Sequence, residues 1–431
     1  MIIRKTMKDT IAIVLAAGRG TRMKSGIPKV MHEILGIPMI EHVLSSIRDA
    51  GVKDITVVTG HGSEALKKSL KGTKVLRQKN LLGSGDAVNT ARVSLKGFGG
   101  NVLVVCGDTP LLKSDTIKNL VRKHETSRAT ATVLTVTLKD PAGYGRIVRD
   151  SDGKVMKIVE EKDAPIYEKV ITEINVGTYC FKGTDLFRAL AGVKPDNNKK
   201  EYYLTDVIGI FNRERKAVES LETDDSDEAI GINTRKDLAL ATASLKNRTL
   251  ERVMAFGVTI EDPSSTTIYP GARIGRDSVI RPNTLIESDV TIGRNCSIGP
   301  FTRIRPGARI GDGVEVGNFV ELVRTAVGDN SKIKHHTYLG DTSVGKNVNI
   351  GAGTIVANFD GVRKNRTVVG DSAFIGIGAR LIAPLRIGRG ALVGAGSVVC
   401  KNHDVPDGAT VVGVPARVIR KKKPFGAASR K

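Results

Sequence analysis

The chain contains 431 residues, of which 40% are apolar and 4% aromatic, and its formal net charge is +22. Its length predicts roughly two to four domains. The sequence has no apolar run long enough for a signal peptide or a membrane span, so we expect a cytoplasmic protein without integral membrane association. The positive charge favours phosphorylated partners, but no nucleic-acid-binding module accompanies it, so we expect small phosphorylated substrates and no specific nucleic acid.

The first predicted element is a buried strand, Ile11–Val14, followed by a glycine-rich segment from Leu15 to Lys29. Glycines let the backbone turn and point N–H groups at an anion, and this segment also carries four cations: Arg19, Arg22, Lys24 and Lys29. The P-loop and the dinucleotide-binding fingerprint both need glycine where Met23 stands, so these two motifs are excluded. A strand end, a glycine-rich turn and clustered cations together predict a polyphosphate site.

Strand and helix patterns alternate along the first half of the chain. We expect strands at Ile55–Val58 and Asn101–Val105 and helices at Pro38–Asp49, Glu64–Leu70 and Ser114–His124. This alternation predicts a mostly parallel sheet in an α/β, Rossmann-like domain, whose ligands bind at the carboxyl ends of the strands.

Asp108 lies at one such strand end, within Cys106–Pro110. An aspartate before a proline is commonly a turn former. Here it follows a buried strand in a chain that already carries a polyphosphate motif, and Mg²⁺ needs few carboxylates because phosphate oxygens and water complete its coordination. Asp108 is therefore predicted to bind a divalent cation.

A six-residue repeat dominates the second half. Its β-branched residues follow one another without a slip at Ile268, Ile274, Ile280, Ile286, Ile292, Ile298, Ile304, Ile310 and Val316, and the rhythm returns from Val369 to Val411. This period fits short parallel strands that point β-branched side chains into a narrow core, with the coils stacked as a solenoid. Between Val356 and Val369 the repeat is interrupted, and the inserted residues are predicted to project and to build part of a site.

A predicted helix from Asp237 to Met254 separates the two patterns, because it lacks Gly and Pro. The expected organisation is a Rossmann-like domain over residues 1–235, a linker helix over 236–256, and a repeat domain over 257–431 with a basic C-terminal tail. The four widely spaced cysteines are typical of a reducing compartment.

The segment Leu15–Lys29 resembles the signature of the sugar-nucleotide pyrophosphorylases, and Val30–Val43 is similar to its continuation. The resemblance implies transfer of a nucleotidyl group from a nucleoside triphosphate to a sugar 1-phosphate, with release of pyrophosphate. It also implies that Mg²⁺ is bound by Asp108 and Asn233. Further substrate-binding residues implied for this half are Leu15, Ala16, Ala17, Gly18, Arg22 and Lys29 for phosphate, Gln78, Gly83 and Ser84 for uracil, and Gly145, Glu160 and Asn175 for the sugar.

Both halves together resemble a bifunctional family, the N-acetylglucosamine-1-phosphate uridylyltransferases that are also glucosamine-1-phosphate N-acetyltransferases. The repeat resembles the hexapeptide pattern of the left-handed parallel β-helix. The resemblance implies UTP and acetyl-CoA as substrates, a homotrimer, and His335 as the base of acetyl transfer. It implies Arg305, Tyr338, Asn349 and Lys364 as ligands of the sugar phosphate, and Ala352, Asn358, Phe359 and Ala395 as ligands of acetyl-CoA.

The second half departs from the family pattern at a few positions. Val323 stands where a phosphate-binding lysine is usual, with Arg324 beside it, and Phe359, Ile377 and Gly413 replace Tyr, Ser and Arg. Two alternatives therefore stay open. In the first, the protein is a sugar-1-phosphate nucleotidyltransferase whose β-helix is structural or regulatory or acylates a different amino sugar. In the second, which is based on charge alone, the protein binds nucleic acid.

Overall fold

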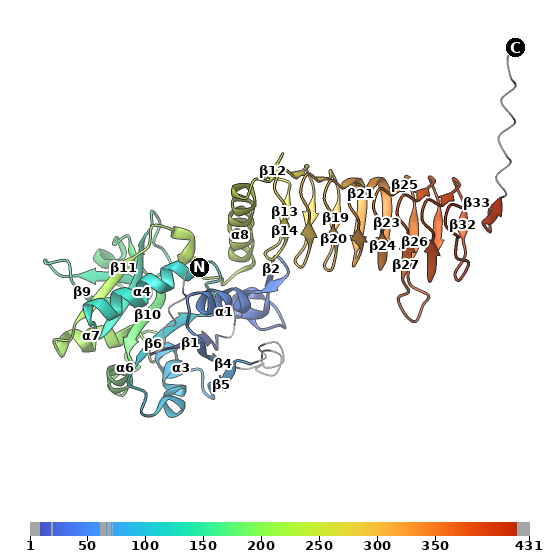
Figure 1. The fold of residues 1–431 in the computed structure, drawn as a ribbon. Coiled ribbons are helices and arrows are strands. Elements are labelled where there is room, and N and C mark those ends of the chain that lie inside the picture. The colour runs from blue at the N-terminus through green and yellow to red at the C-terminus, as the bar shows by residue number, and fades with distance from the viewer. Residues whose placement is uncertain (1–8, 19, 61–65, 67–69, 71, 420–431) are drawn as a thin grey trace, which may run out of the picture. The chain divides into compact units, whose positions relative to one another are not determined.

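The computed structural model describes residues 9–18, 20–60, 66, 70 and 72–419 (Figure 1). The chain divides into two compact units, Met1–Ser244 and Leu245–Lys431, and each is described by itself. Helix α8 (Arg235–Ala255) crosses this division and covers most of the predicted linker helix. Within the described residues, no helix is both long enough and apolar enough to cross a membrane.

A sheet forms the centre of the first unit, with its main strands in the order β11-β7-β10-β6-β1-β4-β5. All neighbouring strands in the order β6-β1-β4-β5 are parallel to one another. Strand β10 is antiparallel to both β6 and β7. A hairpin of β8 (Arg146–Arg149) and β9 (Val155–Val159) extends from β10. The predicted Rossmann-like, mostly parallel sheet is thus confirmed. The strands are β1 (Thr10–Ala16), β4 (Asp54–Thr59), β5 (Lys74–Arg77), β6 (Asn101–Cys106), β7 (Ala131–Thr137), β10 (Glu173–Lys182) and β11 (Val218–Glu222).

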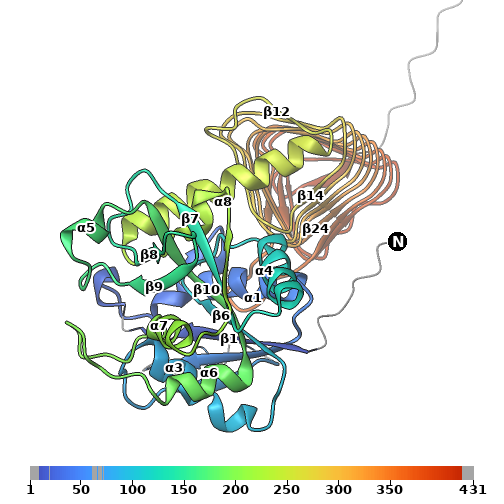
Figure 2. The same cartoon turned by 90° about the vertical axis from the view of Figure 1, so that its left-hand side faces the viewer.

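Helices cover both faces of this sheet, because alternate residues of its apolar strands point in opposite directions (Figure 2). Ala12 and Val14 pack into the core under α1 (Met39–Asp49) and α4 (Ser114–Ser127). Ile13 packs into the opposite core, with α3 (Ser84–Thr90), α6 (Gly183–Leu190) and α7 (Asp206–Arg213). A short helix, α5 (Ile166–Lys169), follows β9, and a two-stranded ribbon of β2 (Glu33–Ile34) and β3 (Ile37–Pro38) precedes α1. The helix predicted at Glu64–Leu70 lies mostly outside the described residues.

The second unit is a coil of short parallel strands with three faces (Figure 2). Face A holds β12 (Thr259–Ile260), β15 (Val279–Ile280), β18 (Ser297–Ile298), β25 (Asn349–Ile350), β28 (Phe374–Ile375), β31 (Leu392–Val393) and β33 (Thr410–Val412). Face B holds β13 (Thr267–Ile268), β16 (Leu285–Ile286), β19 (Arg303–Ile304), β26 (Ile355–Ala357), β29 (Arg380–Ile382) and β32 (Val398–Val399). Face C holds β14 (Arg273–Ile274), β17 (Thr291–Ile292), β20 (Arg309–Ile310), β22 (Ala326–Val327), β24 (Thr342–Val344), β27 (Thr367–Val369) and β30 (Leu385–Ile387).

Two longer strands, β21 (Glu315–Val323) and β23 (Lys332–Gly340), run along face A, round the corner and along face B without a break. β34 (Arg417–Ile419) pairs antiparallel with β33 after the last coil.

The predicted inward residues of the repeat form the core of this unit. Ile280, Ile298 and Val316 succeed one another in register on face A, and all three are buried. Small polar residues stabilise the corners, since the Ser278 hydroxyl donates to the Gly293 carbonyl at 2.9 Å and the Ser331 hydroxyl to that of Gly345 at 2.7 Å. The hexapeptide β-helix expected from the repeat is therefore confirmed.

The insertion between Val356 and Val369 forms a projecting hairpin between faces B and C (Figure 1). Phe359 bridges Lys364 across it, and the Asp360 carboxylate accepts hydrogen bonds from the main-chain N–H groups of Val362 and Arg363 at 3.0 and 2.8 Å. These bonds hold the hairpin in a tight turn without any contribution from the core.

Candidate functional site

The glycine-rich segment follows β1 and borders a cavity of about 310 Å³. Its lining residues are Ala16, Ala17, Gly18, Pro28, Lys29, Val30, Thr59, Leu66 and Leu81. Leu15, on β1, pairs with Cys106 of β6 and Val58 of β4, which places the segment at the carboxyl end of the sheet. Gly20 has φ +61°, and a Cβ atom there would lie 2.8 Å from Lys29 Cβ, so glycine is needed where the Lys29 stem crosses the turn. Arg22 is exposed on the next turn.

Three predicted residues that are far apart in the sequence meet beside this cavity. The ammonium group of Lys29 donates to Asp108 Oδ2 and, at 3.1 Å, to Asn233 Oδ1. The side chains of Lys29 and Asp108 are only 12% and 23% exposed. The Ile232 N–H donates to the Asp108 carbonyl at 2.9 Å, which joins the two ligand-bearing segments directly.

The orientation of Asn233 is fixed by its own neighbours. Its Nδ2 donates to the Gly231 carbonyl at 3.2 Å, and its main-chain N–H donates to Asp237 Oδ2 at 2.9 Å. Oδ1 of Asn233 and Oδ2 of Asp108 therefore converge on one point, which the ammonium of Lys29 fills as a stand-in cation. Two oxygen donors at a phosphate-binding turn fit Mg²⁺, which keeps waters and phosphate oxygens as its other ligands.

The residues predicted to read uracil lie together at the start of α3. The buried amide of Gln78 donates to the Gly83 carbonyl at 3.2 Å and to Asp86 Oδ2 at 2.7 Å. Gly83 has φ +111°, and a Cβ atom there would lie 2.6 Å from the Tyr202 carbonyl oxygen. The Ser84 hydroxyl accepts a hydrogen bond from the Leu204 N–H at 3.0 Å. The uracil segment is thus held by the chain around residues 202–204, a connection that its sequence alone does not reveal.

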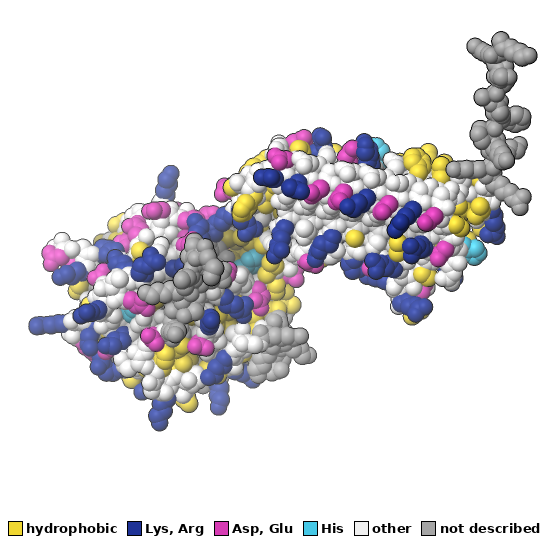
Figure 3. Space-filling view, viewed as in Figure 1, with side chains coloured by type: hydrophobic (Ala, Val, Ile, Leu, Met, Phe, Trp, Pro, Cys, Tyr) yellow, Lys and Arg dark blue, Asp and Glu magenta, His cyan; other side chains and the backbone are white. Residues whose placement is uncertain are grey.

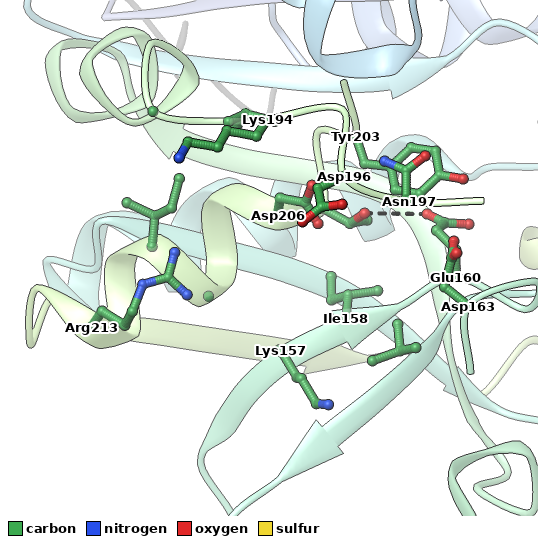
Figure 4. A pocket seen from close by; sticks show the side chains of 16 residues that line it. Lys157, Ile158, Glu160, Asp163, Lys194, Asp196, Asn197, Tyr203, Asp206 and Arg213 are labelled. Carbon is green, nitrogen blue, oxygen red and sulfur yellow. Dashed lines mark hydrogen bonds between the residues drawn. The ribbon is translucent and has the colours of Figure 1, made fainter. Parts of the chain in front are cut away.

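Glu160 lines a cavity of about 580 Å³ (Figure 4). Its Oε1 accepts a hydrogen bond from the Thr205 hydroxyl at 3.2 Å, and burial raises the pKa of its carboxyl group. Figure 4 shows that Tyr203 and Asp163 lie at the same end of this cavity, whereas Lys194 and Arg213 lie at the other end. Of these cavity residues, the sequence analysis selected only Glu160.

The other two predicted sugar ligands lie beside β10. The Asn175 N–H donates to the Gly145 carbonyl at 2.9 Å, and Asn175 Nδ2 donates to the Tyr179 hydroxyl at 2.6 Å. The Cys106 thiol contacts the Gly177 carbonyl at 3.4 Å, which brings the irregular part of β10 to the strand end that carries Asp108. Burial, helped by Asp108, raises the pKa of the Cys106 thiol to about 12, so this thiol is no nucleophile at neutral pH.

In the second unit, the corner between faces A and B carries a column of residues that includes three of the predicted acetyl-transfer residues, His335, Ala352 and Ala395. His335 follows Asn318 in register, and Ala352, Ile377 and Ala395 occupy the same corner in later coils. In each later coil, the residue that follows the column residue donates its main-chain N–H to the carbonyl oxygen of the column residue one coil earlier. The N···O distances are 3.4 Å for His335, 2.7 Å for Ala352 and 2.7 Å for Ile377. Those donors are glycines with positive φ, so the floor beside the column has no side chains.

His335 is exposed, and its Nδ1 lies 2.8 Å from Asn318 Oδ1. An amide oxygen only accepts, so Nδ1 carries the proton and Nε2 keeps a free lone pair. The adjacent His336 instead lies against Phe319, with ring centroids 4.9 Å apart. Asn318 was not among the residues predicted from the sequence, and its contact orients the imidazole ring of His335.

A second group occupies the corner between faces B and C. A Cβ atom on Gly340 would lie 2.6 Å from both the Tyr338 hydroxyl and Asn358 Nδ2, so these two predicted ligands meet over that glycine. Asn358 Nδ2 donates to Asp341 at 2.6 Å, and Arg324 donates to the same carboxylate at 2.6 and 2.8 Å. The hydrogen bonds from Arg324 hold the pKa of Asp341 below its usual value.

The remaining predicted ligands are spread over the coil. Arg305 donates to Glu321 at 3.0 Å, while its buried Nε has no hydrogen-bond partner among the described residues. Lys364 and the exposed Phe359 lie on the projecting hairpin, and Asn349 lies on face A. Val323 is buried on face B, whereas Arg324 beside it has φ +48° and its guanidinium faces Asp341. One chain therefore presents these residues in separate groups.

Cations on the coil surface are interleaved with carboxylates (Figure 3). Arg294 pairs with Asp312 at 2.8 Å, and Lys346 pairs with Asp329 at 2.9 Å. Each of these pairs joins residues of two neighbouring coils. Much of the positive charge on this surface is thus neutralised locally.

Comparison with known proteins adds three family models and several relatives. A MobA-like NTP transferase domain matches residues 12–198, a bacterial transferase hexapeptide (six repeats) matches residues 289–324, and a hexapeptide repeat of succinyl-transferase matches residues 366–401. A bifunctional protein GlmU from Pelotomaculum thermopropionicum is 45% identical over 411 residues, covering 88% of this chain and 90% of the relative. The proteins of that name from Shouchella clausii and Acetivibrio thermocellus are 43% and 41% identical, each again over 88% of this chain, and over 91% and 90% of their own lengths.

Proposed function

This chain belongs to the family of bifunctional GlmU proteins, and from this premise we propose that it carries out two consecutive transfers in UDP-N-acetylglucosamine synthesis. The second unit acetylates glucosamine 1-phosphate with acetyl-CoA. The first unit then transfers UMP from UTP to N-acetylglucosamine 1-phosphate and releases pyrophosphate. The observation that carries the proposal is the convergence of Asp108 and Asn233 on one cation beside the glycine-rich turn.

Uridylyl transfer needs no nucleophilic side chain in this proposal. The glycine-rich turn, Arg22 and Lys29 hold the triphosphate, while Glu160 and Asn175 orient the sugar so that its phosphate oxygen faces the α-phosphorus in line. Asp108 and Asn233 hold Mg²⁺, which when bound supplies charge neutralisation at the phosphates. The acceptor oxygen then displaces pyrophosphate.

Acetyl transfer uses the corner column of the second unit. Asn318 keeps Nδ1 of His335 protonated, so Nε2 takes the proton as the glucosamine amine attacks the thioester carbonyl and coenzyme A leaves. Ala352 and Ala395 of this column, together with Asn358 and Phe359, bind acetyl-CoA. Arg305, Tyr338, Asn349 and Lys364 bind the sugar phosphate, and the buried, unpartnered Nε of Arg305 is suited to a phosphate oxygen.

We also infer a homotrimer. The predicted ligands of the second unit lie at different corners and on different faces of one coil, so a site that uses all of them needs more than one chain. The exposed, stacked rings of Phe301 and Phe319, with centroids 5.4 Å apart, support burial of the corner between faces A and B in an assembly. The four free cysteines support activity in a reducing compartment such as the cytoplasm.

The test is to incubate the protein with glucosamine 1-phosphate, acetyl-CoA, UTP and Mg²⁺ and to identify the products by mass. UDP-N-acetylglucosamine and free coenzyme A are the expected products. A matched reaction replaces glucosamine 1-phosphate and acetyl-CoA with N-acetylglucosamine 1-phosphate. If only the matched reaction yields the nucleotide sugar, the β-helix is structural or regulatory or acylates another amino sugar, as Val323 and Ile377 would favour.

A further inference from the structure

We propose that Lys29 is a resident counter-cation of the metal site, which holds Asp108 and Asn233 together in the free enzyme and leaves them when the divalent cation enters with the nucleotide. This inference rests on the proposed assignment of these two residues as metal ligands. It adds a second role to a lysine that otherwise serves only to bind phosphate.

The first argument is the position of the ammonium group. Lys29 Nζ donates to Asp108 and to Asn233 Oδ1, the same two oxygens that the metal assignment requires. A divalent cation binds carboxylate oxygen at about 2.0–2.1 Å if it is Mg²⁺. A metal at that distance from Asp108 would lie in direct contact with the ammonium, and the two like charges would repel strongly in a half-buried site. The lysine and the metal therefore exclude each other.

The second argument is that Lys29 has another anion within reach. The same residue lines the 310 Å³ cavity beside Ala17 and Gly18, where the triphosphate is proposed to bind. Its stem is anchored over Gly20, so only the end of the side chain needs to turn from the carboxylate toward the cavity. Only the terminal torsions of the lysine side chain have to change, and a phosphate oxygen would replace the lost carboxylate as partner.

The exchange has a consequence for ligand binding. Without nucleotide, a metal ion must expel the ammonium and leave it without an anionic partner, so metal affinity is low. With UTP present, the expelled ammonium pairs with phosphate, so the nucleotide and the metal bind cooperatively through Lys29. This exchange keeps the oxygens of Asp108 and Asn233 oriented in the free enzyme. It also makes the affinity for the metal depend on bound nucleotide.

The experiment measures Mn²⁺ binding to the full-length protein by electron paramagnetic resonance, with and without UTP. Lys29→Met removes the ammonium and keeps most of the stem. Lys53→Met is the matched control, because it removes one exposed lysine of the same unit. We expect Lys29→Met to bind Mn²⁺ without UTP at least about tenfold more tightly than the wild type, and Lys53→Met to be unchanged. UTP should improve the Mn²⁺ affinity of the wild type more than that of Lys29→Met.

Two further results separate the possible failures. Equal Mn²⁺ affinity of Lys29→Met and Lys53→Met without UTP, with binding lost in Asp108→Asn, would keep the metal site and overturn the exchange. Unchanged Mn²⁺ binding in Asp108→Asn with UTP would overturn the metal assignment itself, and the exchange with it. Thermal unfolding gives a check on folding: Mn²⁺ should stabilise Lys29→Met more than the wild type, and Lys29→Gln serves if the methionine variant does not fold.

Discussion

The carboxylate of Asp108 is the residue on which most of the proposed chemistry of the first unit converges. Asp108→Ala removes a proposed metal ligand and also leaves the buried end of Lys29 without its ion-pair partner. We expect pyrophosphate release to fall by at least about 100-fold, because charge on the phosphates is no longer neutralised. Acetyl transfer by the second unit should continue, which a coenzyme A release assay measures in the same sample. Full pyrophosphate release by the variant, or by the wild type in excess chelator, would contradict the assignment.

His335 allows an equally direct test in the second unit. General-base catalysis contributes roughly 10²–10⁴-fold, so His335→Ala should slow coenzyme A release by about that factor and leave uridylyl transfer unchanged. Asn318→Leu, which removes the acceptor of the Nδ1 proton, should give a smaller loss.

The neighbouring histidine provides the matched control. His336→Ala removes a ring that contacts Phe319, so it should change thermal stability slightly and acetyl transfer little. If His336 proved essential and His335 dispensable, the assignment would be wrong by one residue.

Several site residues were predictable one by one, but their partners were not. Lys29, Asp108 and Asn233 could each be selected from local motifs, yet nothing in those motifs states that the lysine occupies the point between the two oxygens. Asn318 was missed because its contact with His335 depends on the number of residues in each coil. Glu315 pairs with Lys332, seventeen residues on, whereas Ser297 pairs with Glu315, eighteen residues on. Only the observed register brings Asn318 beside His335.

At the scale of elements, the turn after β23 places two proposed ligands over one glycine. A Cβ atom on Gly340 would come within 2.6 Å of the Tyr338 hydroxyl and of Asn358 Nδ2, which are the far ends of their side chains rather than backbone atoms. Gly340→Ala should therefore fold, since these ends can shift, but should lower the rate of acetyl transfer about tenfold or more through misplacement of both groups. The measurement is coenzyme A release together with a melting curve. An unchanged rate in a folded variant would remove Tyr338 and Asn358 from the site.

The packing of α4 on β7 predicts a dependence of stability on pH. His124 of α4 lies 3.0 Å from the Thr132 hydroxyl of β7, and burial lowers its pKa to about 4. The unfolded chain binds this proton more tightly than the folded chain, so stability is lost as pH falls from about 6.5 to about 4. At 1.36 kcal/mol per pKa unit, the loss from this one group is at most about 3 kcal/mol.

His124→Asn keeps a polar atom near Thr132 and removes the titrating group. Thermal unfolding followed by circular dichroism between pH 4 and 7 should show a weaker pH dependence for this variant than for the wild type. Equal pH slopes would mean that the pKa of His124 is the same in the folded and the unfolded chain, which would contradict the effect of burial.

The sequence predicted the regular elements well and the irregular ones poorly. The expected strands at Ile55–Val58 and Asn101–Val105 lie within β4 and β6, because long apolar runs bounded by polar residues leave little choice. The antiparallel direction of β10 was not foreseen, since a strand buried on both faces reads the same in either direction. In the second unit the six-residue period defined the inward positions, but the continuous strands β21 and β23 replaced two of the expected corners.

For the whole molecule, the proposed trimer predicts a mass three times the 46.1 kDa of one chain. Light scattering at micromolar concentration should give this mass. Phe319→Glu adds a charge to the exposed, stacked pair of Phe301 and Phe319. It should therefore shift the mass toward that of the monomer and reduce acetyl transfer more than uridylyl transfer. A monomer mass for the wild type would contradict the assembly and would leave the separate ligand groups of the second unit unexplained.

The corner column from His335 to Ala395 sets regular distances along the axis of the coil. Successive coils are spaced by about 4.8 Å, so the three steps from His335 through Ala352 and Ile377 to Ala395 mark off roughly 14 Å along a straight line. The hairpin between Val356 and Val369 adds residues to one coil, yet it leaves this spacing intact because the extra chain projects sideways. The length of acetyl-CoA that fits between His335, the proposed base, and Ala395 at the far end of the column can therefore change only in steps of one coil. Loop insertions would leave that length unchanged, whereas removal of one complete coil would shorten it by about 4.8 Å.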